Sequence, residues 1–160
     1  MTALSFPDNI SNVSLNERTE FVKGPKNNFG NELAVLTVSL VNAEGKVVGY
    51  RDLCLLKSNS NLKLPTLSGN ELKVPDYIIY DYVFVDPKER NKGIGHTLAS
   101  GGIEVIESFK ARCISEGIIT EASIVGYLLF DTSGDGWSSR IADQYNIPQI
   151  NNGKFRGVIV

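Results

Sequence analysis

The chain has 160 residues, of which 42% are hydrophobic and 21% are charged, with a formal net charge of -2. This length and composition fit a single globular domain over residues 1–160 with a sizeable core. The slight acidic excess argues against a protein whose main partner is the nucleic-acid backbone, because such domains usually carry a marked excess of Lys and Arg.

Neither a leader nor a membrane span is expected. Residues 1–12 contain no basic segment followed by an apolar one, and no apolar run approaches the roughly 20 residues needed to cross a bilayer. Cys54 and Cys113 lack paired spacing and the chain has one histidine, so neither a disulfide nor a zinc site is predicted. We therefore expect a cytoplasmic protein with two reduced, packed thiols and no metal.

The first third of the chain predicts a short helix followed by a hairpin. Within the polar N-terminal segment only 14–22 resembles a helix, with Ser14 as its cap and Glu17 three residues later. Apolar and polar residues then alternate in two runs on either side of a turn at 43–46. Residues 32–57 are therefore predicted to form an antiparallel hairpin.

A long polar link at 58–76 follows the hairpin. It contains Pro65, Gly69 and Pro75, and a link of this size is either a mobile surface loop or a functional excursion that contacts a partner. The usual behaviour of such links favours the surface loop.

The next segment carries most of the information in the sequence. A run rich in Tyr, Ile, Val and Phe predicts a central strand at 77–85, and a proline turn follows. From His96, apolar side chains recur at helical spacing up to a stop at Gly117. Gly101 and Gly102 weaken a helix by about 1 kcal/mol each relative to Ala, so we expect that turn to pack closely on the sheet.

The remaining residues give a weaker pattern. Part of 118–130 is predicted as a strand, with a helix as the alternative, because a short apolar run does not reveal its period. A loop at 132–136 includes Asp135, which can cap a helix at 137–145, and 154–160 is a final short strand. These elements predict an α/β (α+β) fold: a mixed twisted sheet with an antiparallel N-terminal part and helices on both faces.

The loop between the central strand and the helix has the features of an anion site. Gly93 and Gly95 lack the Cβ atoms that would hold a ligand away, and N–H groups at a helix start attract phosphate. Arg90 and Lys92 add positive charge at the same place. The alternative is an ordinary glycine-containing connection between a strand and a helix.

The segment VDPKERNKGIGHTL, which begins at Val85, resembles the acyl-CoA-binding signature of the GNAT superfamily of N-acyltransferases. That signature is Arg or Gln, two residues, Gly, one residue, and Gly or Ala, after a strand that ends in Val-x-Pro. Arg90, Gly93 and Gly95 match it. The resemblance is strong over 77–113 and weak elsewhere.

The resemblance implies acetyl-CoA as the cosubstrate. The loop would bind its pyrophosphate, and its pantetheine arm would lie along the edge of the preceding strand like an added strand. The residues implied for the loop are Arg90, Asn91, Lys92, Gly93, Ile94 and Gly95, and those implied for the strand edge are Val83, Phe84 and Val85.

The resemblance also implies direct transfer of the acetyl group to a primary amine in a ternary complex, which needs a base and a general acid. Asp81 stands where many family members carry an acidic residue and is the candidate base; alternatively it pairs with Arg90 or lies at a strand bulge. Tyr145 is the candidate acid ahead of Tyr127, and either tyrosine could instead pack in the core. His96 is expected to be a cap or a surface residue.

The short N-terminal segment bears on the acceptor. About 30 residues precede the first convincing strand, fewer than the family uses for one wall of the acceptor site, and an open groove would suit a protein or peptide amine. Tyr77, Tyr80, Tyr82 and Phe84 line this groove or belong to the core. A homodimer is compatible with this outline. Two rival functions are a catalytically inactive binding or regulatory module and a toxin-like acetyltransferase of aminoacyl-tRNA, which the acidic charge disfavours.

Overall fold

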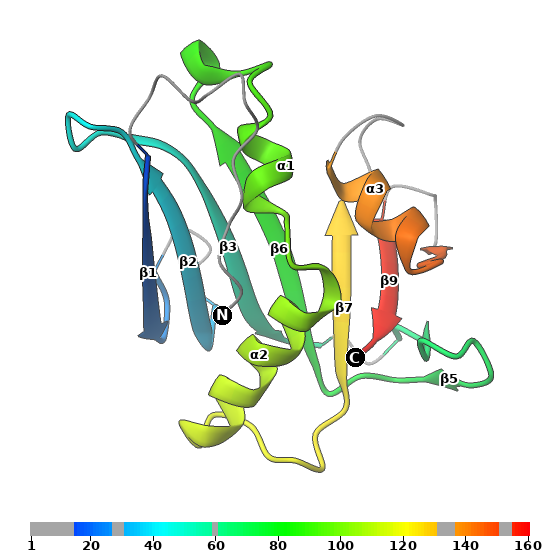
Figure 1. Cartoon of the computed structure of the whole chain (residues 1–160). Coiled ribbons are helices and arrows are strands. Elements are labelled where there is room, and N and C mark those ends of the chain that lie inside the picture. The colour runs from blue at the N-terminus through cyan, green and yellow to red at the C-terminus, as the bar shows by residue number, and fades with distance from the viewer. Residues whose placement is uncertain (1–14, 27–30, 59–60, 131–136, 151–154) are drawn as a thin grey trace.

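Seven strands form one mixed sheet in the computed structural model, which describes residues 15–26, 31–58, 61–130, 137–150 and 155–160 (Figure 1). The strands lie in the order β1, β2, β3, β6, β7, β9 and β8, and among these strand pairs only β6 and β7 run parallel. Their bounds are Asn16–Lys23 for β1, Ala34–Val41 for β2, Val47–Lys57 for β3, Tyr77–Val85 for β6, Val125–Phe130 for β7, Gln149–Ile150 for β8 and Phe155–Ile159 for β9.

The N-terminal part of the sheet is the predicted hairpin, β2 and β3, extended by β1. The prediction of a helix at 14–22 is wrong, because β1 pairs with β2 along its whole length. Phe21 of β1 packs on Phe109 of α2 (Gly102–Ser115). The guanidinium of Arg112 lies 4.8 Å from the centre of the Phe21 ring. Pairing and packing outweigh the local capping pattern.

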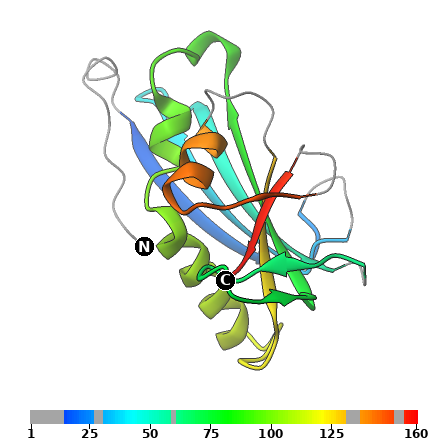
Figure 2. The same ribbon diagram turned by 90° about the vertical axis from the view of Figure 1, so that its right-hand side faces the viewer.

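The three described α-helices lie on the same face of the sheet (Figures 1 and 2). Their bounds are Ile94–Leu98 for α1, Gly102–Ser115 for α2 and Trp137–Gln144 for α3. Ile106 and Phe109 of α2 pack in the main core with residues of β3, β6 and β7, among them Leu53, Ile79 and Tyr127. Helices on both faces were predicted, but in the described ranges no α-helix covers the second face. The described chain before β2 forms strand β1 at the edge of the sheet and not a helix.

The central strand follows the prediction and then separates from its parallel neighbour. β6 stays paired with β3 along its whole length, up to Val85. Its pairing with β7 runs from Tyr77 to Asp81 only, so the next residues, 82–85, have no strand beside them on that side among the described residues. The sheet therefore opens between β6 and β7 at the end that leads into the glycine-spaced loop.

The single helix predicted from His96 is two helices with a break at 99–101. Gly101 and Gly102 both have left-handed backbone angles, φ 92° and 56°, which only glycine adopts readily. A Cβ added to Gly102 would collide with the hydroxyl of Tyr145. The close neighbour of Gly102 is therefore Tyr145, the residue that follows α3, while the sheet reaches the same break through Arg51 of β3, which donates to the carbonyls of Leu98 and Ser100.

The link at 58–76 forms more structure than a surface loop. It contains a two-stranded hairpin, β4, Leu64–Pro65, and β5, Leu72–Lys73. Leu64 is fully buried and would contact any Cβ added to Gly126 or Gly157, so the hairpin packs on β7 and β9. The buried leucine in a polar link explains why the segment is held against the sheet.

The last part of the chain confirms the predicted strand within 118–130, the helix and the final strand as β7, α3 and β9. The predicted loop at 132–136 with its cap Asp135 lies outside the described residues. In the part of the chain that the structure describes, no helix is both long enough and apolar enough to cross a membrane.

Candidate functional site

A cavity of about 630 Å³ lies where the sheet opens, between the end of β6 and the start of α1. It brings together all the residues predicted for the cofactor except Lys92. Tyr82, Glu89 and His96, which the sequence did not assign to the cofactor, also line it. The full lining is Tyr82, Val83, Phe84, Val85, Glu89, Arg90, Asn91, Gly93, Ile94, Gly95 and His96.

Two residues of the loop that line the cavity have left-handed backbone angles. Asn91 has φ 66° and Gly93, the residue before α1, has φ 80°. The carbonyl of Gly93 accepts hydrogen bonds from the N–H and the hydroxyl of Thr97, which fixes the first turn of α1. Since the first turn of a helix has no acceptors within the helix for its N–H groups, the loop presents hydrogen-bond donors beside the cavity.

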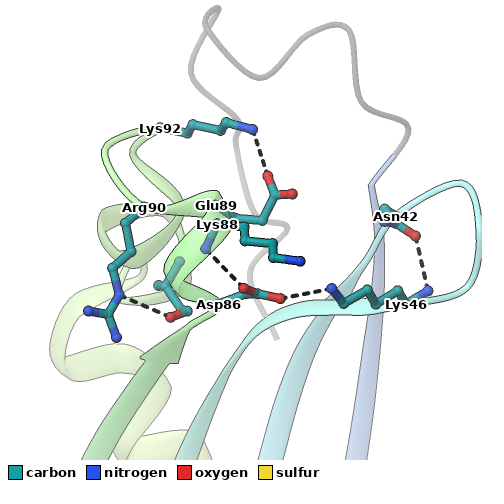
Figure 3. A network of polar contacts seen from close by, with 8 residues as sticks. Asn42, Lys46, Asp86, Lys88, Glu89, Arg90 and Lys92 are labelled. Atoms are coloured by element: carbon teal, nitrogen blue, oxygen red, sulfur yellow. Dashed lines mark hydrogen bonds and ion pairs between the residues drawn. The ribbon is translucent and has the colours of Figure 1, made fainter.

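The base of the loop is anchored to the turn between β2 and β3 (Figure 3). Asp86 accepts a hydrogen bond from the N–H of Lys88 and forms a 3.0 Å ion pair with Lys46. These two contacts, the backbone bond first, hold the pKa of Asp86 below its usual range. These contacts fix the first residue of the loop, although the tip of the loop is exposed.

The charges of the loop are arranged unequally. Lys92 forms a 2.7 Å ion pair with Glu89, which offsets part of its charge (Figure 3). Lys92 does not line the cavity. The Nε of Arg90 donates to the carbonyl of Val85 over 3.3 Å, which leaves the rest of its guanidinium at the cavity. Arg90 is therefore the cation that the loop offers to an anionic ligand.

The open edge of β6 presents backbone groups to the same cavity. The N–H of Asp86 donates toward β3, to Val48, whereas the N–H of Tyr77 donates to Ile124, just before β7. Because backbone groups alternate along a strand, those of Val83 point to the side that β7 leaves open. Val83 is therefore placed to exchange hydrogen bonds with an extended ligand.

Asp81, the predicted base, lies in the core and not at the cavity. Its side chain is fully buried and accepts two hydrogen bonds from Arg51, 2.9 Å from Nε and 2.7 Å from Nη2. The hydroxyl of Tyr127 donates a third, over 2.5 Å. The pairing of β6 with β3 is continuous, so there is no bulge at Asp81, and its partner is Arg51 where the sequence suggested Arg90. This geometry does not support its assignment as a base, because an amine cannot reach it.

The two candidate tyrosines lie in different surroundings. Tyr127 is fully buried, and burial, followed by the charge of Asp81, raises the pKa of its hydroxyl well above the usual value. It is the core tyrosine with a satisfied hydroxyl that the sequence allowed. Tyr145 is half-buried, and its hydroxyl lies against Gly102 at the break between α1 and α2.

A second cavity, of about 400 Å³, lies at this break. Tyr145 and the two glycines of the break line it together with Glu104 and His96. His96 lines both cavities, so the two share a wall at the first turn of α1. The full lining is His96, Ala99, Ser100, Gly101, Gly102, Glu104, Ile141, Gln144 and Tyr145.

Arg51 is the functional candidate that the sequence analysis missed. It is 2% exposed, and its Nη1 also donates to the carbonyls of Leu98 and Ser100, 3.2 and 3.4 Å away, at the end of α1. It therefore ties the helix break to Asp81. The signal was an arginine inside one apolar strand and an aspartate inside the next, which predicts a buried pair when the two strands are neighbours.

The aromatic residues proposed for an acceptor groove divide between the two faces of the sheet. Tyr77 packs against the main core on the helix side. On the other face, Tyr50 stacks on Phe84 with ring centres 5.3 Å apart and lies 6.2 Å from the ring of Tyr82, which is 43% exposed. Tyr82 and Phe84 also line the cavity at the end of β6, so this aromatic patch adjoins that cavity, whereas Tyr50 lines neither cavity.

No protein-family model and no curated protein sequence matches the chain. Among solved structures it is similar to a candidate acetyltransferase from Acinetobacter baylyi ADP1, with 12% sequence identity and a TM-score of 0.37 over 79% of this chain. The chain spans 64% of the length of that protein. A likeness at this level does not define a family, so the chemistry rests on the residues of the site.

Proposed function

We propose that the protein is a GNAT-like N-acyltransferase that moves an acetyl group from acetyl-CoA to a primary amine in a ternary complex. One observation carries the proposal: a glycine-spaced loop that offers Arg90 opens into the same cavity as the unpaired edge of β6. Phosphate binding and strand-like pairing are two separate demands of an acyl-CoA, and here they adjoin.

The residues present fit this cosubstrate. Arg90 and the N–H groups of the loop suit a pyrophosphate, and the absence of a side chain at Gly93 and Gly95 lets a ligand approach the backbone closely. The N–H and carbonyl of Val83 suit the amide groups of a pantetheine arm. Glu89 lines the cavity as well, and its ion pair with Lys92 reduces its repulsion of an anion.

Acetyl-CoA would supply an activated thioester, and the chain would position it and manage protons. The position of Tyr145 supports its assignment as the general acid. Its hydroxyl lies beside a cavity that shares His96 with the cosubstrate site. A hydroxyl there can donate a proton to the departing thiolate. The burial of Asp81 removes the predicted base from this scheme.

A binding module without turnover is the second candidate, and the burial of Asp81 is the observation that favours it. A fold that binds acyl-CoA does not by itself catalyse transfer. The two candidates share the cosubstrate and differ only in whether an amine is acetylated.

Calorimetry with acetyl-CoA tests the shared part. The variant Gly93→Glu should abolish measurable binding, because it places a carboxylate in the loop and a side chain at a φ of 80°, where it is strained. The matched control is Gly69→Glu, in the turn between β4 and β5, where φ is also positive at 76° and nothing lies within 4 Å. If acetyl-CoA does not bind the wild type, or binds Gly93→Glu as tightly as Gly69→Glu, the cosubstrate is wrong.

Mass spectrometry of amines incubated with labelled acetyl-CoA separates the two candidates. The panel should hold aliphatic polyamines, aminoglycosides and lysine-containing peptides, with Gly93→Glu as the negative control. Enzyme-dependent label on any amine supports the transferase. Tight binding of acetyl-CoA with no transfer to any of them supports the module.

A further inference from the structure

The cavity at the helix break, lined by His96, Ser100, Gly102, Glu104, Gln144 and Tyr145 among others, has a chemistry unlike that of the cosubstrate site. Among its lining residues, Glu104 carries the only formal charge when His96 is neutral. The neighbouring cavity has Arg90, and its carboxylate, Glu89, is paired with Lys92. One cavity thus suits an anion and the other suits a cation.

Glu104 is available to a ligand. It is exposed, it lies in the first turn of α2, and no ion pair or side-chain hydrogen bond to another described residue engages it. The same cavity offers the hydroxyl of Tyr145 and the amide of Gln144 as further hydrogen-bonding groups. An ammonium group, which has three donors and no acceptor, matches a carboxylate with neutral acceptors beside it.

The cavity has a defined shape because hydrogen bonds from the sheet fix the helix break. Arg51 binds the carbonyls of Leu98 and Ser100, and the positive φ of Gly101 and Gly102 turns the chain into α2. The volume of about 400 Å³ and the small residues at the break leave room for a slender aliphatic chain, whereas a folded protein surface could offer at most a side chain.

We propose that this cavity is the acceptor site and that it takes a small aliphatic primary amine, with Glu104 binding its ammonium group and His96 accepting its proton. The inference rests on the proposed function and adds to it the acceptor class and the base. It also differs from the sequence-based expectation of an open groove for a protein amine.

The transfer balances with these groups. His96 takes one proton from the ammonium and later releases it to water. The amine nitrogen then forms a bond to the thioester carbonyl carbon, the carbon–sulfur bond breaks, and the electron pair of that bond stays on sulfur. Tyr145 gives its hydroxyl proton to the thiolate and is reprotonated by the proton that the new amide nitrogen loses. The products are an N-acetylated amine, CoA thiol and one proton.

Steady-state kinetics with 1,4-diaminobutane and spermidine as probes test the proposal. Glu104→Gln should raise KM for the amine by about tenfold or more, the loss expected for one hydrogen bond to a charged group, while calorimetry finds the Kd for acetyl-CoA within about twofold of the wild type. The matched control is Glu107→Gln, an exposed glutamate of α2 that lines neither cavity, which should leave both constants unchanged.

A second measurement does not depend on turnover. His96 is the only histidine of the chain, so the NMR signals of its imidazole report on one site. In the presence of CoA, 1,4-diaminobutane should shift these signals in the wild type and not in Glu104→Gln.

Three results would overturn the acceptor assignment while leaving the proposed function intact. They are transfer to other amines with neither probe accepted, an unchanged amine KM in Glu104→Gln, and a loss of acetyl-CoA affinity in that variant, which would make the cavity part of the cosubstrate site. If the wild type binds no acetyl-CoA, the proposed function itself fails and the acceptor site falls with it.

Discussion

Arg51 of β3 donates two hydrogen bonds to Asp81 of β6 on the helix side of the sheet, and both side chains are at most 3% exposed. Burial alone would lower the pKa of Arg51, but the charge of Asp81 and its hydrogen bonds outweigh burial and raise it. The pair therefore stays charged in the core and joins the centre of the sheet to the end of α1.

The substitution Asp81→Asn should destabilise the fold by about 3–5 kcal/mol, because it leaves the charge of Arg51 buried without a counterion. Urea unfolding of the purified variant measures this loss. The control is Lys73→Gln, which removes the exposed Lys73–Glu71 pair and should cost less than about 1 kcal/mol. Equal losses in the two variants would contradict the structural role of the buried pair.

The tyrosines should separate stability from catalysis. Tyr127→Phe removes one hydrogen bond to Asp81 and should lower the free energy of unfolding by about 1–2 kcal/mol, with little effect on kcat. Tyr145→Phe should lower kcat and leave the Kd for acetyl-CoA nearly unchanged, because a general acid acts on the departing thiolate. A fall in kcat with Tyr127→Phe alone would reverse the assignment.

Replacing Gly102 should disturb the helix break. In Gly102→Ala the new methyl group collides with the hydroxyl of Tyr145, and φ 56° is strained for any residue with a Cβ. Gly117→Ala is the matched control, because its φ of 74° carries the same kind of strain and nothing lies within 4 Å. We expect Gly102→Ala to lose more stability than Gly117→Ala in thermal unfolding, whereas equal melting temperatures would mean that the contact is absent.

The two cysteines should make the fold sensitive to alkali. Burial raises the pKa of Cys113 to about 12, and burial together with nearby carboxylates, Asp52 first, raises that of Cys54 to about 12. Unfolded thiols ionise near pH 8.5, so above that pH the unfolded chain loses protons that the folded chain keeps. The stability that the two protonated thiols contribute is fully present below about pH 8.5. It falls as the pH rises toward 12, by up to about 1.4 kcal/mol per pH unit for each thiol.

Unfolding free energies at pH 8 and pH 10 measure this dependence. The double variant Cys54→Ala/Cys113→Ala should be less stable than the wild type at pH 8, because it leaves cavities, but it should lose less stability between the two pH values. Comparing the pH dependence of stability in the two proteins cancels the titration of lysines and tyrosines, which both proteins share. Parallel slopes would show that the thiols are not protected by the fold.

Glu32 is a buried carboxylate that lacks a hydrogen-bond partner in the described part of the chain. It is 2% exposed, and both carboxylate oxygens are unsatisfied there. Glu32→Gln replaces an acid by a neutral group of the same shape and should raise the free energy of unfolding at pH 8 by about 1 kcal/mol or more. Glu44→Gln, at an exposed turn, is the control and should change nothing. A destabilised Glu32→Gln would indicate a cation at this site.

The sequence predicted the central strand, the loop and the hairpin because each is determined by local chemistry. Val83 to Gly95 combines a β-branched run, a proline turn and spaced glycines, and all of these act within a few residues. β1 was missed because its strand state depends on pairing with β2, which local caps do not report. The helix break was missed because only the position of Tyr145, more than 40 residues away, explains two adjacent glycines.

The site was predictable to the same extent. The residues predicted for the cofactor come from one contiguous segment, and all but Lys92 line one cavity. The outcome for the candidate catalytic residues does not follow from a contiguous segment, because their surroundings form only in the fold: Asp81 is buried by Arg51 of another strand, and His96 lines two cavities. Spacing along the chain carries no information about such contacts.

The open edge of β6 also bears on self-association. Unpaired strand edges are templates for aggregation, and proteins usually shield them. Here the opening at 82–85 is about 13 Å long at the usual rise per residue, and β7 closes it at one end while the loop closes it at the other. An opening of that length can pair with only a few backbone groups of an added strand. The fold thus limits how much of this unpaired backbone a neighbouring chain could cover in solution.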